Sequence, residues 1–326
     1  MKFRQVGRSG LKVSELSLGA MTFGRESPAE EVGRIVAAAI EKGVNFFDTA
    51  NSYAGGESEK ILGALLKGSR HSQVIATKFA NPVAPDANGR GASRIHILRT
   101  VEQSLRSLQT DYIDVYYVHH VDHVTPIDET LRTLDDLVSA GKVRYVGASN
   151  FEAWRLLESL WVAETKGYSR YVIYQPQYNL LVRDIEDEII PVCQRKGVGV
   201  VPWSPLAGGL LTGKYQSVDA PSNTRLSDRG GLGKWGSFYA DNRDEIVRAV
   251  KSVASELGAT PAAVALRWVL SRPGVSSALI GARTLEQAEA NLAAADLTLP
   301  PEALTLLDTV SRPRPRYPKD SESTRP

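Results

Sequence analysis

The sequence predicts an α/β fold in which eight parallel strands close into a (β/α)8 barrel, also called a TIM barrel. Two observations lead to this prediction: short apolar runs alternate with longer helical patterns, and the alternation occurs eight times in 326 residues. Parallel strands need a crossover connection, usually a helix, and eight such units are the number that closes a barrel. The apolar runs cover residues 16–21, 45–50, 74–79, 112–120, 143–150, 172–179, 198–206 and 276–282.

Helical patterns separate these runs. They cover residues 28–43, 57–68, 94–108, 128–142 and 186–197. Several end in Gly after Lys, a common signal for the end of a helix. The main alternative is an open doubly wound sheet, which would have a glycine-rich turn directly after its first strand. The segment LGAMTFG at 18–24 does not fit that pattern, and GLGKWG at 231–236 follows no strand, so we interpret its G-x-G-x-x-G spacing as a chance match.

Two further segments stand apart from the repeated units. The segment 207–241, after the seventh strand, is long, rich in glycine and carries Trp235, Phe238 and Tyr239. Long loops of this kind are often lids or binding loops. The residues from Ser311 onward are rich in proline and charge, which is typical of a surface or disordered tail. We therefore predict one barrel domain over residues 1–310 and a tail over 311–326.

Composition excludes several classes of function. The chain has 39 Lys plus Arg and 37 Asp plus Glu, so it lacks the basic excess of a nucleic-acid-binding protein. Its single cysteine, Cys193, rules out a disulfide framework within the chain and favours a reducing cytoplasm. The N-terminus lacks the apolar segment of a signal peptide, and the apolar runs are far shorter than the ~20 residues that span a bilayer. We expect a soluble cytoplasmic protein that binds neither nucleic acid nor membranes.

Polar residues at the strand ends are the candidate site, because barrel enzymes place their active sites at the C-terminal ends of the strands. Asp48 lies near the end of the second run, and Tyr53 follows that run. Lys78 lies near the end of the third run, and His119 and His120 end the fourth. Taken alone, any one of these residues is more often a turn residue, a solvated residue or a core residue than part of an active site. Their occurrence on three successive strand ends indicates a shared site. Burying Lys78 and Asp48 separately would be costly, so we expect them to pair.

This pairing has a chemical use. A phenol with a pKa of ~10 is a poor acid at neutral pH, and a nearby ammonium lowers that pKa. Lys78, held by Asp48, can act on Tyr53 in this way. His119 can bind the carbonyl oxygen that Tyr53 protonates, which describes a proton donor for a developing alkoxide.

The later strand ends can seat a hydride donor. Ser149, Asn150 and Gln175 can hydrogen-bond a carboxamide, and Trp203 can stack on a flat ring.

Seven motifs together resemble the aldo-keto reductase superfamily, in particular the branch of bacterial oxidoreductases and potassium-channel β subunits. The resemblance covers about residues 3–310, through NFFDTANSYAGGESEKILG, VIATKF, DYIDVYYVHHVD, VGASNF, QPQYN, WSPLAGGLLTGKY and LIGARTLEQAEANL. It implies a barrel preceded by an N-terminal β-hairpin, here residues 1–14. It also implies the reduction of an aldehyde or ketone, as a small-molecule substrate, by NADPH without a metal.

The resemblance assigns roles to residues. Tyr53 would be the general acid, Lys78 and Asp48 its tuning pair, and His119 the residue that orients the substrate. Ser149, Asn150 and Gln175 would hold the amide of the nicotinamide. Residues 204–208, Lys214 and Arg225 would bind the pyrophosphate. Arg283 would bind the 2′-phosphate, and Gln287 and Asn291 would contact the adenine. The full set implied to contact NADPH/NADP+ is Gly19, Ala20, Met21, Asp48, Ser149, Asn150, Gln175, Trp203, Ser204, Pro205, Leu206, Ala207, Gly208, Lys214, Arg225, Gly281, Arg283, Gln287 and Asn291.

The chain departs from the family pattern at four positions. The family often has Thr at the position of Ala20, Glu at that of Gln177 and an acidic residue near Ala290. The last departure puts one adenine contact in doubt. His120 replaces the common Trp or Arg, which changes the pocket wall more than the chemistry.

Three hypotheses about the function follow from these observations. The first is an NADPH-dependent oxidoreductase that reduces a carbonyl compound. The second is a non-catalytic NADPH-binding sensor or regulatory subunit, as in the channel-associated branch, whose members typically carry Asn at the position of His119; the complete tetrad favours the enzyme. The third is a metal-dependent hydrolase that uses His119, His120 and His123. Neighbouring residues on a strand point to opposite faces, so His119 and His120 would not ligate one ion easily, and we expect no metal. The sequence does not identify the substrate or the oligomeric state.

Overall fold

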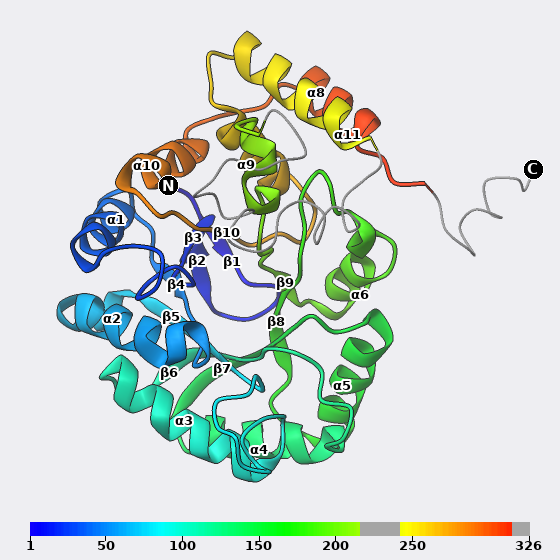
Figure 1. Ribbon diagram of the computed structural model, residues 1–326. Coiled ribbons are helices and arrows are strands. Elements are labelled where there is room, and N and C mark those ends of the chain that lie inside the picture. The colour runs from blue at the N-terminus through cyan, green and yellow to red at the C-terminus, as the bar shows by residue number, and fades with distance from the viewer. Residues whose placement is uncertain (216–241, 315–326) are drawn as a thin grey trace, which may run out of the picture.

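Eight parallel strands form the centre of the molecule in the computed structural model, which describes residues 1–215 and 242–314 (Figure 1). The strands are β3 (Leu16–Gly19), β4 (Phe46–Asp48), β5 (Val74–Phe79), β6 (Ile113–Val118), β7 (Val143–Ser149), β8 (Tyr171–Gln175), β9 (Gly199–Val200) and β10 (Ala278–Ile280). They follow one another in the order β10-β3-β4-β5-β6-β7-β8-β9. Seven predicted apolar runs contain one of these strands and the run 172–179 overlaps β8, which begins one residue earlier, so the predicted order is confirmed.

The sheet closes on itself through residues at and beyond its two end strands. The Val200 backbone accepts a hydrogen bond from the Ser276 N–H at 2.8 Å and donates one to the Gly274 carbonyl at 3.0 Å. Further along, the Leu279 N–H donates to the Pro202 carbonyl at 3.0 Å. These bonds join the β9 segment to the β10 segment and complete the predicted (β/α)8 barrel.

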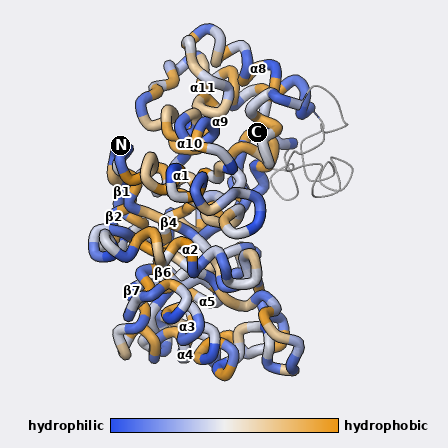
Figure 2. The backbone as a smooth tube through the Cα atoms, turned by 60° about the vertical axis from the view of Figure 1, so that its left-hand side comes forward, coloured by the Kyte–Doolittle hydropathy of each residue, from blue (hydrophilic) through white to orange (hydrophobic). Residues whose placement is uncertain are grey.

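Helices surround the strands on the outside (Figure 1). In the described part of the chain they are α1 (Ala29–Glu41), α2 (Glu57–Leu66), α3 (Arg94–Leu108), α4 (Ile127–Ser139), α5 (Ala153–Lys166), α6 (Ile189–Lys196), α8 (Arg243–Glu256), α9 (Pro261–Leu270), α10 (Leu285–Leu292) and α11 (Pro301–Val310). Helix α4 is amphipathic, with Leu131, Leu134 and Leu137 buried at helical spacing, whereas α9 is buried over most of its length. Hydrophobic and hydrophilic residues accordingly alternate along the tube of Figure 2. No helix among these described segments is long and apolar enough to cross a membrane.

An N-terminal hairpin precedes the barrel, as predicted. Strands β1 (Phe3–Gln5) and β2 (Lys12–Ser14) pair antiparallel. Val6 and Val13 are fully buried and belong to the same apolar cluster as Phe46 and Val115 on the barrel strands. The hairpin therefore covers the N-terminal end of the barrel, and Glu15, which follows it, sits at the N-terminal end of β3.

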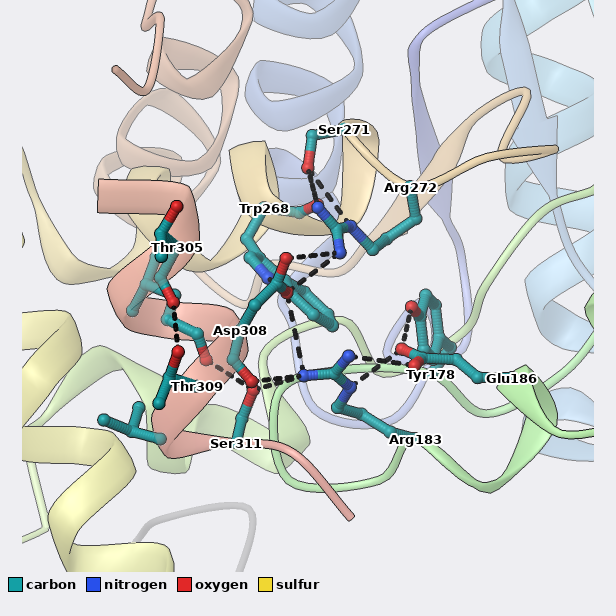
Figure 3. Close-up of polar contacts among 12 residues, drawn as sticks. Tyr178, Arg183, Glu186, Trp268, Ser271, Arg272, Thr305, Asp308, Thr309 and Ser311 are labelled. Carbon is teal, nitrogen blue, oxygen red and sulfur yellow. Dashed lines mark hydrogen bonds and ion pairs between the residues drawn. The ribbon is translucent and has the colours of Figure 1, made fainter. Parts of the chain in front are cut away.

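The C-terminal helix is held by a polar network (Figure 3). Asp308 of α11 accepts hydrogen bonds from Trp268 Nε1 at 2.9 Å and from Arg272 Nη1 at 2.9 and 3.0 Å. Arg183, in the loop before α6, donates to the Ser311 hydroxyl at 2.7 Å. Ser311 is only 4% exposed, so the first residue of the predicted tail is part of the packed structure.

Two sequence features lie largely outside the described residues. Of the predicted long loop 207–241, the described start forms a 3-10 turn at Ala207–Thr212, and the GLGKWG segment is not described. The predicted tail is described as far as residue 314.

Candidate active site

A pocket of about 650 Å³ opens at the C-terminal ends of the barrel strands. Most of the predicted site residues line it: Gly19, Met21, Asp48, Tyr53, His119, Ser149, Asn150, Gln175, Trp203, Ser204, Pro205, Leu206, Gly208, Lys214, Gly281, Arg283, Gln287 and Asn291. They come from the ends of several strands and from the loops that follow, so residues distant in sequence meet at one mouth.

Three predicted residues within the described part of the chain do not line the pocket. Lys78 is fully buried beneath it. Ala20 is fully buried as well, and its backbone N–H donates to the Asp48 carbonyl at 2.8 Å, so it supports the neighbouring strand. Ala207 is also buried, at the start of a 3-10 turn. Arg225 lies outside the described residues.

A buried ion pair lies at the base of the pocket. Lys78 on β5 and Asp48 at the end of β4 are 0% and 1% exposed at the side chain, and their charged groups are in direct contact. The Lys78 ammonium also donates to the Thr49 carbonyl at 2.7 Å, and Gln175 Nε2 donates to the second Asp48 oxygen at 2.8 Å. Both charges thus have several partners, which is the condition under which buried charges are tolerated.

Tyr53 lies directly above this ion pair. The 3-10 turn Tyr53–Gly56, which follows β4, places the phenol so that Lys78 Nζ is 5.1 Å from its ring centroid. Burial by itself lowers the pKa of Lys78, but the adjacent Asp48 and Tyr53 raise it, and the net pKa lies above the ordinary lysine value. The lysine is therefore a permanent positive charge beneath the phenol.

His119 faces Tyr53 across the mouth. The two rings are 5.8 Å apart in an edge-to-face arrangement. Burial, assisted by the charges of Lys78 and His120, lowers the pKa of His119 to about 2, so the imidazole is neutral at physiological pH. Its Nδ1 lies 3.1 Å from Asn81 Nδ2. Asn81 lines the pocket and was not among the predicted site residues.

The alternation of side chains along a strand predicts that His120 points away from His119, toward the loop packing or the pocket rim. It lies at the pocket, but the predicted opposite orientation is wrong. The two imidazoles stack with centroids 4.7 Å apart and planes 10° apart, and both line the pocket. Strand β6 ends at Val118, so the alternation of side chains along a strand does not extend to these histidines. His123 is exposed and 3.5 Å from Arg155. In the described ranges, no group of three or more His, Cys, Asp or Glu side chains is arranged to hold a metal ion.

Amide and hydroxyl groups form one wall of the pocket. Asn150 adopts a positive φ of 58°, and its Nδ2 donates to the Ser149 hydroxyl at 2.9 Å and to the His119 carbonyl at 3.0 Å. Trp203 Nε1 donates to Asn150 Oδ1 at 3.1 Å. The wall thus offers hydrogen-bonding groups beside an indole ring. Trp203 lies beyond the short strand β9, in the loop that follows it.

At the end of the pocket beside α10, the charge of Arg283 is partly balanced by Glu26. Arg283 precedes α10, and its backbone N–H donates to Gln287 Oε1 at 3.0 Å. Its Nε lies 3.7 Å from the Glu26 carboxylate, a neighbour that sequence patterns did not indicate because it comes from the loop before α1. Asn291 Nδ2 donates to the Gly281 carbonyl at 3.1 Å. Lys214 lines the same pocket.

Comparison with known proteins agrees with this architecture. The family described as the aldo/keto reductase family matches residues 15–312. An uncharacterized oxidoreductase of Bacillus subtilis is 37% identical over 95% of this chain and 96% of its own length. A protein of Arabidopsis thaliana named "Probable voltage-gated potassium channel subunit beta" is 35% identical over 98% of this chain and 99% of its own, and an aldo-keto reductase of Alternaria alternata is 34% identical over 96% and 92%. The chain belongs to the aldo/keto reductase family.

Proposed function

We propose that the protein is an NADPH-dependent oxidoreductase that reduces an aldehyde or a ketone to an alcohol. The observation that carries the proposal is the meeting of Tyr53, Lys78 and His119 at one mouth, with the Lys78 ammonium 5.1 Å from the phenol centroid and the neutral imidazole 5.8 Å away. Family membership and the oxidoreductase relative support it.

The residues present fit a nicotinamide dinucleotide. A pocket of about 650 Å³ is within the range of small-molecule sites. The amide-rich wall of Ser149, Asn150 and Gln175 suits a carboxamide, Trp203 suits a flat ring, and Arg283 at the far end suits a phosphate. When bound, NADPH supplies the hydride that the reduction requires.

The chain's own groups supply the proton. Tyr53 Oη gives its proton to the carbonyl oxygen as that oxygen becomes an alkoxide. The fixed charge of Lys78 stabilises the phenolate that remains, and Asp48 holds the ammonium in place through their ion pair. His119, being neutral, retains one ring N–H that can donate to the same oxygen and orient the substrate.

Replacement of Tyr53 by Phe tests the proposal. Tyr53→Phe removes the proton donor and keeps the ring, so we expect reduction across an aldehyde and ketone panel to fall by about 10² to 10⁴-fold. NADPH binding, followed by fluorescence titration, should stay within about twofold, because the removed hydroxyl serves the substrate oxygen. Tyr168→Phe, which alters a half-buried tyrosine outside the pocket, is the matched control. Undiminished turnover by Tyr53→Phe would contradict the assigned role.

One comparison favours a second function. A relative named as a potassium channel β subunit matches almost the whole chain, which is compatible with a regulatory subunit that binds NADPH without turnover. Wild-type protein that binds NADPH but oxidises none across the panel would support this second function and contradict the first.

A further inference from the structure

Asn81 contacts the imidazole of His119. It lies in the loop after β5, three residues beyond Lys78, and lines the pocket. Its Nδ2 is 3.1 Å from His119 Nδ1 and 3.2 Å from the Ser52 hydroxyl. The same loop is tied to the histidine through the backbone, because the His119 N–H donates to the Phe79 carbonyl at 3.0 Å.

The backbone that carries Asn81 is strained. Ala80, the residue before it, has a φ of 91°, in a region that non-glycine residues rarely adopt. The Ala80 carbonyl accepts a hydrogen bond from the Gly91 N–H at 2.9 Å, which fixes the turn. Strain of this kind costs about 1–3 kcal/mol and persists where the surrounding structure demands it, often at functional sites. Here the strained residue, Ala80, directly precedes the residue whose side chain contacts the imidazole.

The contact has a defined chemical meaning. A neutral imidazole has one N–H donor and one acceptor nitrogen, and the bond made by one nitrogen decides where the proton resides. An amide N–H directed at Nδ1 makes that nitrogen the acceptor and leaves the proton on Nε2. Among the described residues, Asn81 is the hydrogen-bond partner of the His119 ring.

We propose that Asn81 is a positioning residue that holds His119 as its Nε2–H tautomer, so that the ring donates a hydrogen bond to the carbonyl oxygen of the substrate. This inference rests on the proposed reduction of a carbonyl compound. The groups that face the imidazole are the stacked His120, the edge of Tyr53, the buried Lys78 and the amide of Asn81. Of these, Asn81 makes the hydrogen bond that distinguishes the two ring nitrogens.

Asn81→Asp is the sharpest perturbation, because it keeps the shape and replaces the amide donor by an acceptor. The carboxylate would draw a proton onto Nδ1 and would favour imidazolium at low pH. At low pH the imidazolium still donates from Nε2. Above its pKa the variant holds the neutral Nδ1–H form, whose Nε2 cannot donate. We therefore expect kcat/KM of the variant to fall by about 10²-fold as pH rises through the pKa of that imidazolium. This decline adds to any loss from deprotonation of Tyr53, which the variant and the wild type share.

Nitrogen-15 NMR of histidine-labelled protein reads the tautomer without any turnover. The chain has five histidines, and the His119→Gln spectrum identifies the signal of interest. We expect an unprotonated Nδ1 and a protonated Nε2 in the wild type, a protonated Nδ1 in Asn81→Asp, and NADPH affinity within about twofold in both. Ser52→Ala is the control, because it removes the other partner of Asn81 and should leave the tautomer and the pH profile unchanged.

A protonated Nδ1 in the wild type would overturn the proposal, as would an Asn81→Asp variant with unchanged nitrogen shifts and an unchanged pH profile. The wild-type spectrum decides the question even if the variant does not fold. Protein that shows the expected tautomer but reduces no carbonyl compound would contradict the proposed function and leave the structural role of Asn81 intact.

Discussion

Acidification should destabilise the folded protein through His119. The folded environment lowers the pKa of this residue to about 2, first through burial and then through the charges of Lys78 and His120. In the unfolded chain the same imidazole has a pKa near ~6.5. A histidine whose pKa is depressed by folding contributes no penalty above the unfolded pKa, and its cost grows as pH falls below it.

The magnitude follows from these two pKa values. Between pH 8 and pH 5 the unfolded chain takes up a proton at this residue and the folded protein does not. The resulting loss of unfolding free energy is about 2 kcal/mol, from roughly 1.5 pH units at about 1.4 kcal/mol each. The side chain is only 8% exposed, so solvent screening does not reduce this value greatly.

Urea denaturation of the wild type and of His119→Gln at pH 8 and pH 5 measures this loss of unfolding free energy. The other four histidines are present in both proteins, so the difference between them isolates His119. The wild type should lose about 2 kcal/mol more than the variant on going from pH 8 to pH 5. Equal losses, or an NMR titration of His119 with a pKa near 6, would refute the reasoning.

Two other substitutions test the proposed phosphate contact of Arg283 and the polar network that holds α11. Arg283→Ala should weaken NADPH binding about tenfold or more and NADH binding little, because a hydrogen bond to a charged group is worth roughly 1.5–3 kcal/mol; equal losses in fluorescence titrations would remove the argument for a 2′-phosphate contact. Asp308→Ala should lower the unfolding free energy in urea by about 2 kcal/mol, because Trp268 and Arg272 lose their shared acceptor. Glu302→Ala, an exposed change on the same helix, is its control, and similar effects of the two would show that the network contributes little.

The barrel could be predicted because its pattern is repeated and redundant. All six residues of β5 and the three of β4 are buried, so each strand is an apolar run interrupted only by Asp48 in β4 and by Thr77 and Lys78 in β5. In such a run a charged residue is conspicuous. Asp48 and Lys78 were therefore found from sequence, and their predicted pairing is present in the structure.

Features set by irregular backbone could not be predicted in the same way. The predicted orientation of His120 was wrong because side chains alternate between the two faces only within the strand, which ends at Val118. Asn81 was missed because its contact with the imidazole depends on the positive φ of Ala80, and no residue type in that stretch signals such a turn. Glu26 reaches Arg283 only through a tertiary contact between two loops.

The buried ammonium of Lys78 links the two halves of the proposed chemistry. Its charge stabilises negative charge on Tyr53, and the same charge opposes protonation of His119. Lys78 therefore assists the proton donor and adds to the effect of burial, which is the larger cause of the lowered pKa of His119. Asp48, which also lines the pocket, balances the ammonium and is itself held by Gln175. Removing Lys78 would change both neighbours at once and leave Asp48 as an uncompensated buried charge, so losses measured for the separate Tyr53 and His119 variants should not add to the loss on removing Lys78.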